Sequence, residues 1–285
     1  ETVASCSAGG WGRRWWRGWA IVHGVLLLCG TLVMAGCDDN RQEVAMTVPD
    51  KISSMPADKW RRLAAKRIYF GHQSVGDNIV QGLRDILADH PEIGLRVQEK
   101  PQLTIPVGTM FIHAYVGQNE HPDSKNADFA DTVANRLGGK VDMAFYKYCF
   151  VDVDRASDVP RVFEQYRATM QRLKAKDPQV LFVHFTVPLM TVQTGWKAQI
   201  KALLGRPIGG YEDNMRRNQF NDLLRKEYSG KAPVFDLARI ESTQADGSRM
   251  VFQYQGREDQ SLVPEYTRDG GHLRPAWRPL VAQEL

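Results

Sequence analysis

A strand–turn–helix pattern early in the chain most constrains what this sequence can fold into. Residues 68–70 read Ile-Tyr-Phe, a short apolar run that favours a β-strand, and Gly71 interrupts it. Apolar residues then recur at helical spacing, at Val75, Ile79, Leu83, Ile86 and Leu87. We therefore predict a buried strand that passes through a tight turn into a helix, with Ser74 at the turn.

The position of Ser74 allows two interpretations. Open α/β sheets place their ligands at the carboxyl edge of the strands, and the unpaired N–H groups at the start of a helix can stabilise an oxyanion. A nucleophilic serine is therefore one interpretation. The other is an ordinary helix N-cap, a position where serine is common, and this segment taken alone favours it.

A second motif lies near the C-terminus, where residues 268–273 read Arg-Asp-Gly-Gly-His-Leu. A serine nucleophile needs a general base, and that base needs a carboxylate to orient it. Asp269 and His272, three residues apart across two glycines, can supply both groups from one loop. A glycine turn that carries a surface histidine is the alternative.

Together, the serine at a strand–turn and the Asp-x-x-His before a last short helix resemble the SGNH (GDSL-like) hydrolase superfamily. In that family the serine follows the first strand, and the aspartate and histidine share a DxxH motif. The resemblance implies a catalytic triad of Ser74, His272 and Asp269. It also implies two oxyanion donors from later blocks, which we place at Gly117 and Asn119.

Two positions depart from the family pattern. His72 stands two residues before the serine, where relatives carry the Gly-Asp-Ser motif, and we expect it to contact substrate or to orient the loop. The family's Gly-x-Asn-Asp block is missing, because residues 146–152 read Tyr-Lys-Tyr-Cys-Phe-Val-Asp. We expect Lys147 to be a strand-end lysine that reaches solvent, with a position facing the site as the alternative.

Strands and helices alternate along the rest of the chain, which predicts one doubly wound α/β domain with a central, mostly parallel sheet. The resemblance implies the flavodoxin-like, SGNH-type version of this fold. The further strands are expected at residues 95–98, 111–116, 141–148, 180–186 and 234–237. The other helices are expected at residues 58–66, 128–137, 158–176, 213–228 and 276–285.

Polar residues late in the chain and one long loop complete the prediction. Residues 188–210 form a glycine-containing loop that is either functional or a surface insertion. Trp196 and Tyr211, in or beside this loop, are candidates for a wall of a substrate cleft. Four polar residues are expected to be caps and surface contacts: Asn214, Asn221, Asp236 and Glu241.

The N-terminal segment has the pattern of a signal peptide. Three arginines precede an uncharged apolar run at residues 20–35, and small residues then lead to Cys37, which resembles a bacterial lipobox. We predict a signal peptide at 1–36, acylation of Cys37, a tether at 37–57 and the hydrolase domain at 58–285. An uncleaved membrane anchor is the alternative, and both place the domain on the extracytoplasmic side.

Composition excludes several other functions. Residues 1–36 hold three arginines and one glutamate, so without them the net charge falls from +4 to about +2, which gives no case for nucleic-acid binding. Cys149 is then the one cysteine besides Cys37, so no disulfide framework is expected. No CxxC or HExxH spacing indicates a metal, and the expected chemistry requires no cofactor.

These observations predict a lipid-anchored serine esterase of the bacterial cell envelope. Small acyl esters or O-acylated glycans, O-acetylated ones above all, are the expected substrates, and the membrane is the expected partner through the lipid anchor. Transfer of the acyl group to a sugar instead of water is left open. The alternative function is an α/β lipoprotein that binds an envelope ligand without catalysis, and the missing Gly-x-Asn-Asp block is its best support.

Overall fold

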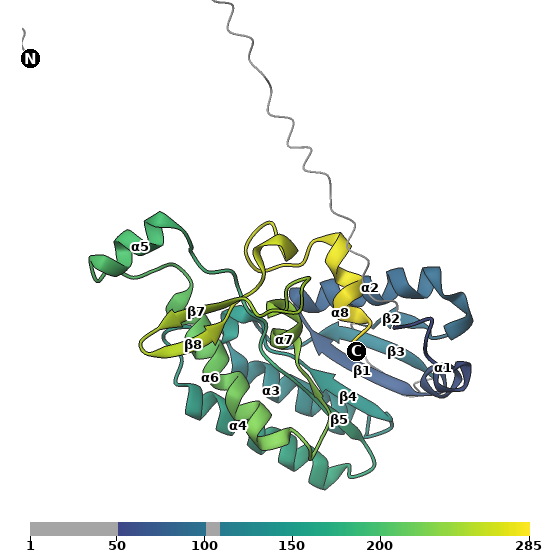
Figure 1. The fold of residues 1–285 in the computed structure, drawn as a ribbon. Coiled ribbons are helices and arrows are strands. Elements are labelled where there is room, and N and C mark those ends of the chain that lie inside the picture. Colours follow the sequence, from purple (N-terminus) through teal and green to yellow (C-terminus); the bar gives the residue numbers. More distant parts are fainter. Residues whose placement is uncertain (1–50, 101–108) are drawn as a thin grey trace, which may run out of the picture. The chain divides into compact units, whose positions relative to one another are not determined.

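The computed structural model describes residues 51–100 and 109–285 (Figure 1). The predicted signal peptide, Cys37 and the tether as far as residue 50 lie outside the described residues. Within the described residues, no helix has both the length and the apolar character needed to cross a bilayer.

Six parallel strands form the central sheet, in the order β2-β3-β1-β4-β5-β6. Their bounds are Arg67–His72 (β1), Val97–Glu99 (β2), Met110–Tyr115 (β3), Met143–Tyr146 (β4), Leu181–Phe185 (β5) and Val234–Phe235 (β6). The chain adds β2 and β3 on one side of β1 and the later strands on the other. The carboxyl end of β1 therefore lies where the winding reverses, which is the ligand-binding position of open α/β sheets. The predicted doubly wound sheet is confirmed.

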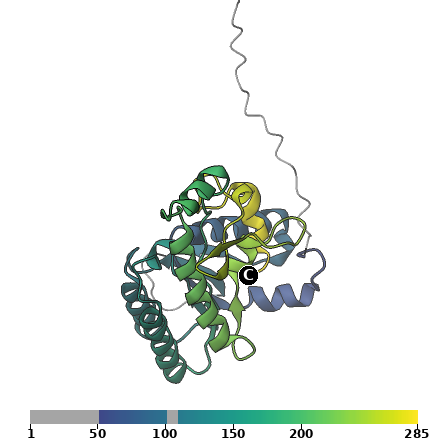
Figure 2. The same cartoon turned by 60° about the vertical axis from the view of Figure 1, so that its left-hand side comes forward.

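Helices cover both faces of this sheet (Figures 1 and 2). Their bounds are Ala57–Ala64 (α1), Val75–Asp89 (α2), Pro122–Asp131 (α3), Val159–Lys176 (α4), Trp196–Leu203 (α5), Tyr211–Tyr228 (α6), Leu237–Ser242 (α7) and Arg278–Ala282 (α8). The alternating side chains of β1 divide the core. Ile68 and Phe70 pack in the layer of α2 and α8, whereas Tyr69 packs in the layer of α3, α4 and α6.

Several boundaries differ from the sequence prediction. The helix expected at 128–137 begins at Pro122, which is a favourable first residue of a helix, and runs on into a π-helical turn at Thr132–Arg136. The expected loop 188–210 contains α5, and the sequence prediction missed α7. Ile52 is buried in the α2 layer, so the folded domain reaches into the range predicted as a tether.

The sequence prediction also missed an antiparallel hairpin of β7 (Val251–Tyr254) and β8 (Arg257–Gln260). Its two-residue turn places Gln255 at φ 49° and Gly256 at φ 75°. Positive φ at both positions is typical of the tight turns that join hairpin strands. The hairpin packs against α6, so it belongs to the edge of the domain and not to the central sheet.

Candidate active site

Ser74 lies in a strained turn between β1 and α2. Its backbone angles are φ 59° and ψ −114°, and the N–H of Gly76 donates to the carbonyl of Gln73 at 3.1 Å. These values match the first central position of a type II′ turn, which glycine usually occupies, and such strain costs about 1–3 kcal/mol. Ser74 stands at the N-cap of α2, yet its hydroxyl makes no capping hydrogen bond. Its side chain is therefore turned to another partner.

That partner is His272, from a loop 198 residues further along the chain. Ser74 Oγ lies 2.6 Å from His272 Nε2, and His272 Nδ1 lies 2.6 Å from Asp269 Oδ2. Because an ionised carboxylate only accepts, Nδ1 carries a proton and Nε2 is left to accept the hydroxyl proton of the serine. The structure therefore brings together the three residues predicted for the triad, at distances suited to a nucleophile and its base.

Asp269 organises its own loop as well as the imidazole. Its Oδ1 atom accepts hydrogen bonds from the N–H groups of Gly271 and His272, at 3.0 and 2.8 Å, and from the hydroxyl of Thr267 at 3.1 Å. Burial raises the pKa of Asp269, but these bonds and the imidazole outweigh it, and the pKa lies well below its usual range. The carboxylate therefore stays ionised throughout the neutral range.

The two glycines of the loop allow close approach to neighbouring segments. A Cβ atom added to Gly271 would lie 2.8 Å from the ring of Phe150, which itself contacts the His272 ring edge-on at a centroid distance of 5.5 Å. Gly270 has φ 90°, and its carbonyl accepts the N–H of Thr191 at 2.9 Å. The loop is thus held against the ends of two other segments.

Asn78 connects the serine to the histidine, and the sequence prediction missed it. It lies one helical turn after Ser74 on α2, is buried, and accepts the N–H of Leu273 at 2.9 Å. The helix that carries the nucleophile therefore also holds the loop that carries the base. The only sequence signal was a polar residue beside the apolar stripe, at helical spacing from Ser74.

Gln73 supports the strained turn from the neighbouring strand ends. Its side-chain amide donates to the carbonyls of Val116 and Gly117, at 3.0 and 2.7 Å. Its own carbonyl accepts the thiol of Cys149 at 3.5 Å. The ends of β3 and β4 thus hold the residue next to the nucleophile.

The predicted role of Gly117 is not supported. Its N–H donates to Asp128 Oδ2 at 2.9 Å, so it is not free to hold an oxyanion. A Cβ atom at this position would lie 2.6 Å from the backbone nitrogen of Lys125, and φ is +54°. Glycine is required here for close packing and backbone conformation.

Asn119 retains a free donor. Its Oδ1 atom accepts from Lys125 Nζ at 2.8 Å, and since an ammonium only donates, the Nδ2 group must be the opposite, exposed end of the amide. Lys125 is fully buried and pairs with Asp152 at 2.5 Å. Asp152 also accepts the N–H of Glu120 at 2.8 Å. The Asn119 amide is therefore set on a buried ion pair that the sequence prediction did not identify.

His72 lies beneath the turn and is fully buried, so direct contact with substrate is excluded and only the loop-orienting role remains. Its Nε2 atom lies 3.0 Å from His113 Nδ1, and His113 Nε2 lies 3.1 Å from Arg84. Because the guanidinium only donates, His113 must donate from Nδ1 to His72. Burial, with the nearby cationic groups, lowers the pKa of His72 to about 2 and keeps it neutral.

Tight packing around His72 explains Gly76 in the same turn. A Cβ atom on Gly76 would lie 2.3 Å from the Cβ of His72. The ring nitrogen Nδ1 of His72 points toward Asp77, 3.8 Å away. Burial raises the pKa of Asp77, while hydrogen bonds from the hydroxyl of Tyr115 and the N–H of Ser74 lower it in part.

Lys147 does not reach solvent as predicted. It is buried, and its ammonium donates to the carbonyl of Tyr148 at 3.3 Å and to Cys149 Sγ at 3.4 Å. Lys147 follows directly after β4, and its charge is among the groups that lower the pKa of the buried His72. Asp236, by contrast, is a helix cap as predicted and accepts the N–H of Arg239.

Three polar residues predicted as caps or surface contacts are instead fully buried and hold the segment after β5. Asn221 binds both the N–H and the carbonyl of Val187, at 2.7 and 2.9 Å, and Asn214 binds both groups of Met190. Glu241 accepts a further N–H of that segment at 2.7 Å. These bonds satisfy buried backbone groups, which is why polar residues are tolerated there. They fix the segment that reaches the His272 loop.

The two aromatic residues predicted to line a cleft have other surroundings. Tyr211 packs its ring against Phe252 and Tyr254 of the hairpin, at centroid distances of 4.6 and 5.8 Å. It therefore anchors the start of α6. Trp196, on α5, is 66% exposed, and its ring centroid lies 5.7 Å from Lys197 Nζ.

Comparison with known proteins gives likenesses of fold. No protein-family model and no curated protein matches this sequence. Among solved structures, one from Streptococcus pneumonia, described provisionally as a platelet activating factor, is 17% identical, with 80% of this chain and 88% of that chain covered and a TM-score of 0.43. A protein of the G-D-S-L family from Desulfitobacterium hafniense, described provisionally as lipolytic, is 9% identical, with coverage of 77% and 97% and a TM-score of 0.37.

A lipase/acylhydrolase from Enterococcus faecalis is 14% identical, with coverage of 64% of this chain and 85% of that chain and a TM-score of 0.35. The observations that bear on function are the contacts of Ser74 with His272 and of His272 with Asp269.

Proposed function

We propose that this chain is a serine hydrolase that cleaves ester bonds. The observation that carries the proposal is the continuous contact from Ser74 Oγ to His272 Nε2 and from His272 Nδ1 to Asp269, at 2.6 Å each. Strain at the serine adds support, because residues held in rare backbone conformations cluster at active sites. A purely structural hydroxyl at this turn would be expected to cap α2, and it does not.

The reaction proceeds in two halves. Ser74 Oγ bonds to the ester carbonyl carbon while His272 Nε2 takes the hydroxyl proton, and a tetrahedral oxyanion forms. His272 then gives that proton to the departing alkoxide, so an alcohol leaves and an acyl-serine remains. Water attacks the acyl-serine with His272 as base, which releases a carboxylic acid and restores the hydroxyl. Asp269 remains ionised and holds the imidazole in one tautomer.

Two donors are available for the oxyanion in this proposal. The N–H of Ser74 lies at the positive end of α2, a helix of 15 residues. The exposed Nδ2 group of Asn119 is the second donor. It takes the place of the asparagine that the missing Gly-x-Asn-Asp block would have supplied.

The proposed substrates and location follow from the sequence of the N-terminal segment. A lipid-anchored enzyme on the extracytoplasmic side meets small acyl esters and O-acetylated glycans, so we propose these as substrates. An acceptor sugar in place of water would make the same site an acyltransferase. The leaving group and the acyl-enzyme are the same in both cases.

A fluorophosphonate probe tests the proposal directly, because it reacts with an activated serine. We expect the full chain to be labelled and both Ser74→Ala and His272→Ala to lose the label. Ser229→Ala, an exposed serine at the end of α6, is the matched control and should label like the wild type. A correctly folded wild type that does not react, or labelling that survives in Ser74→Ala, would overturn the proposal.

One observation favours the alternative, a binding protein without catalysis. The N–H of Gly117 is occupied by Asp128, so the donor expected from the family pattern is lost. Under this alternative, the folded chain would bind an acylated glycan fragment, in isothermal titration, without releasing acetate. Release of acetate that depends on Ser74 would exclude it.

A further inference from the structure

Helix α5 carries a stripe of large apolar side chains that faces away from the domain. The exposed fractions are 66% for Trp196, 44% for Ile200, 86% for Leu203 and 60% for Leu204, the residue that follows the helix. The first three are spaced by four and three residues, so they share one face of the helix. Ala198 is the buried residue of α5, and its position places it on the opposite face.

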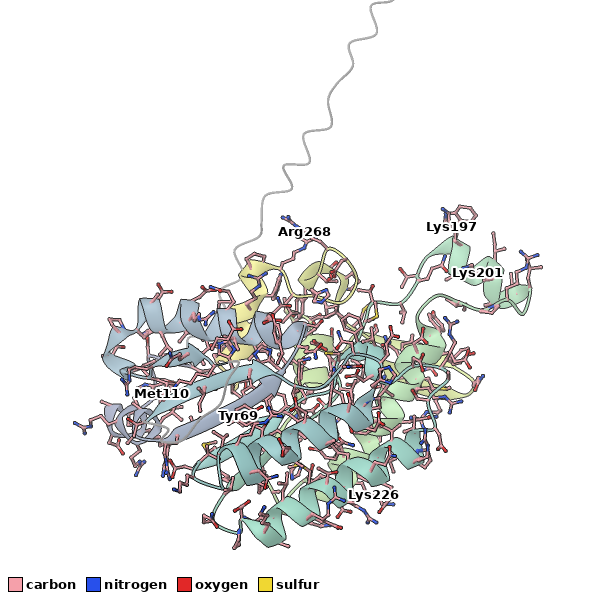
Figure 3. The ribbon with its side chains drawn as sticks, turned by 180° about the vertical axis from the view of Figure 1, so that it is seen from behind. Tyr69, Met110, Lys197, Lys201, Lys226 and Arg268 are labelled. Carbon is pink, nitrogen blue, oxygen red and sulfur yellow. The ribbon has the colours of Figure 1, made fainter. Side chains whose placement is uncertain are left out.

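The helix stands off from the body of the molecule (Figures 1 and 3). Figure 3 places it on the same side of the molecule as Arg268, which belongs to the motif with Asp269 and His272. The chain that leads into α5 also contacts this loop, because the N–H of Thr191 donates to the carbonyl of Gly270 at 2.9 Å. The segment that leads to α5 is therefore tied to the loop that carries His272.

The charged residues of the segment that contains α5 are all basic. Residues 188–210 contain Lys197, Lys201 and Arg206 and no acidic residue. Lys197 Nζ lies 5.7 Å from the centroid of the Trp196 ring, and Lys201 Nζ donates to Gln193 at 2.7 Å. Both lysines thus lie on the helix that carries the apolar stripe (Figure 3), and long basic side chains can keep their ammonium groups in water while their stems cover apolar surface.

We propose that α5 is a membrane-docking helix that inserts its apolar stripe into the surface of an anionic lipid bilayer. A tryptophan and aliphatic residues on one face, with lysines flanking them, is the composition of helices that lie in a membrane interface. A helix of eight residues is about 12 Å long, so it forms a narrow projecting tip. Such a tip suits a deformable lipid surface, and the flanking cations match anionic headgroups.

This docking has a consequence for the substrate, which rests on the proposed hydrolase function. Insertion of α5 would place the His272 loop and Ser74 next to the bilayer surface. Esters presented at that surface, such as acylated amphiphiles, would then reach the serine without leaving the membrane. Water-soluble esters would react equally well with or without docking.

Hydrogen–deuterium exchange on the full chain tests the docking itself. An N-terminal anchor would attach every variant to vesicles, so the readout must be specific to α5. We expect exchange at residues 196–204 to slow about tenfold or more with phosphatidylglycerol vesicles, compared with phosphatidylcholine vesicles or no lipid. The double variant Trp196→Ser/Leu203→Ser should lose this protection. Val251→Ser, another exposed apolar residue on β7, is the matched control and should keep it.

Three outcomes would overturn the proposal. They are exchange that is unchanged by lipid, equal protection by the two kinds of vesicle, and protection that grows with protein concentration in the absence of lipid. The last would show that the stripe pairs with a second copy of the chain. Hydrolysis of water-soluble p-nitrophenyl acetate is measured in parallel, and Trp196→Ser/Leu203→Ser should leave it unchanged. Failure of the hydrolase proposal is thus separated from failure of docking.

Discussion

Replacement of Asp269 by asparagine is the most informative single change at the proposed site. Asparagine keeps one oxygen that can accept the N–H groups of Gly271 and His272, which Oδ1 binds at 3.0 and 2.8 Å. It replaces the other oxygen with an amide NH₂ group that cannot accept from His272 Nδ1. The fold of the loop is therefore preserved while the partner of the imidazole changes from acceptor to donor.

The expected loss of rate follows from the tautomer. With a donor opposite Nδ1, the neutral imidazole carries its proton on Nε2, where it points at Ser74 Oγ and can no longer accept the hydroxyl proton. A wrong tautomer in a serine triad lowers kcat by about 10⁴-fold. At 1.36 kcal/mol for each factor of ten, this loss corresponds to about 5.4 kcal/mol of transition-state stabilisation.

The assay compares kcat for an acetyl ester and the rate of fluorophosphonate labelling in the wild type and Asp269→Asn. Asp246→Asn is the matched control, because Asp246 organises a turn through Ser248, at 2.9 Å from its N–H, without a histidine partner. It should keep full activity. Circular dichroism and thermal unfolding confirm that both variants are folded.

Acidification supplies a second test of the same contact. The pKa of Asp269 is lowered in the folded chain, so its stabilising contribution is complete above the ordinary carboxyl pKa of about 3.9 and is lost as pH falls through the lower folded value. The difference in Tm between wild type and Asp269→Asn should therefore shrink only below about pH 4. If Asp269→Asn keeps kcat within tenfold of wild type, Asp269 does not orient His272 and the triad reasoning is wrong.

Three further perturbations test the surroundings of the site. Ser74→Gly should be more stable to urea than Ser74→Ala by about 1–3 kcal/mol, since glycine relieves the positive φ, and equal stabilities would contradict the strain. Asn78→Ala leaves the N–H of Leu273 buried without an acceptor and should lose about 1–3 kcal/mol of stability together with kcat, while Asn78→Asp restores both. Burial raises the pKa of Glu241 to about 8 from its usual 4.5, so the wild type should lose Tm as pH rises between these values. Glu241→Gln should not lose it, and parallel pH curves of Tm would show that Glu241 is not protonated in the folded chain.

Local patterns predicted the framework of the fold because periodicity is a local property. The apolar run before Gly71 and the helical spacing after Ser74 correspond to β1 and α2. Alternation of strands and helices predicted the parallel sheet, which requires crossover connections of this kind. The elements that were missed, α5, α7 and the β7–β8 hairpin, are short, and their apolar residues follow no long repeat.

The tertiary surroundings of each residue decided which hydrogen-bond donors are free and which charged side chains are buried. Gly117 stands where a donor was expected, but its N–H is taken by Asp128. Lys147 and Glu241 are among the side-chain types most often exposed, and both are buried. Whether a donor is free, or a charge is buried, depends on segments far apart in the chain, and no spacing within one segment records it.

By itself, the sequence determined that a serine follows a buried strand and that an aspartate stands three residues before a histidine, because turns and short loops are set by neighbouring residues. Only the tertiary structure decided that Ser74 and His272 meet, since their 2.6 Å contact spans 198 residues. It depends on the sheet that places β1 at its centre and on Asn78, which joins α2 to the histidine loop. The contact that makes a nucleophile is therefore a property of packing.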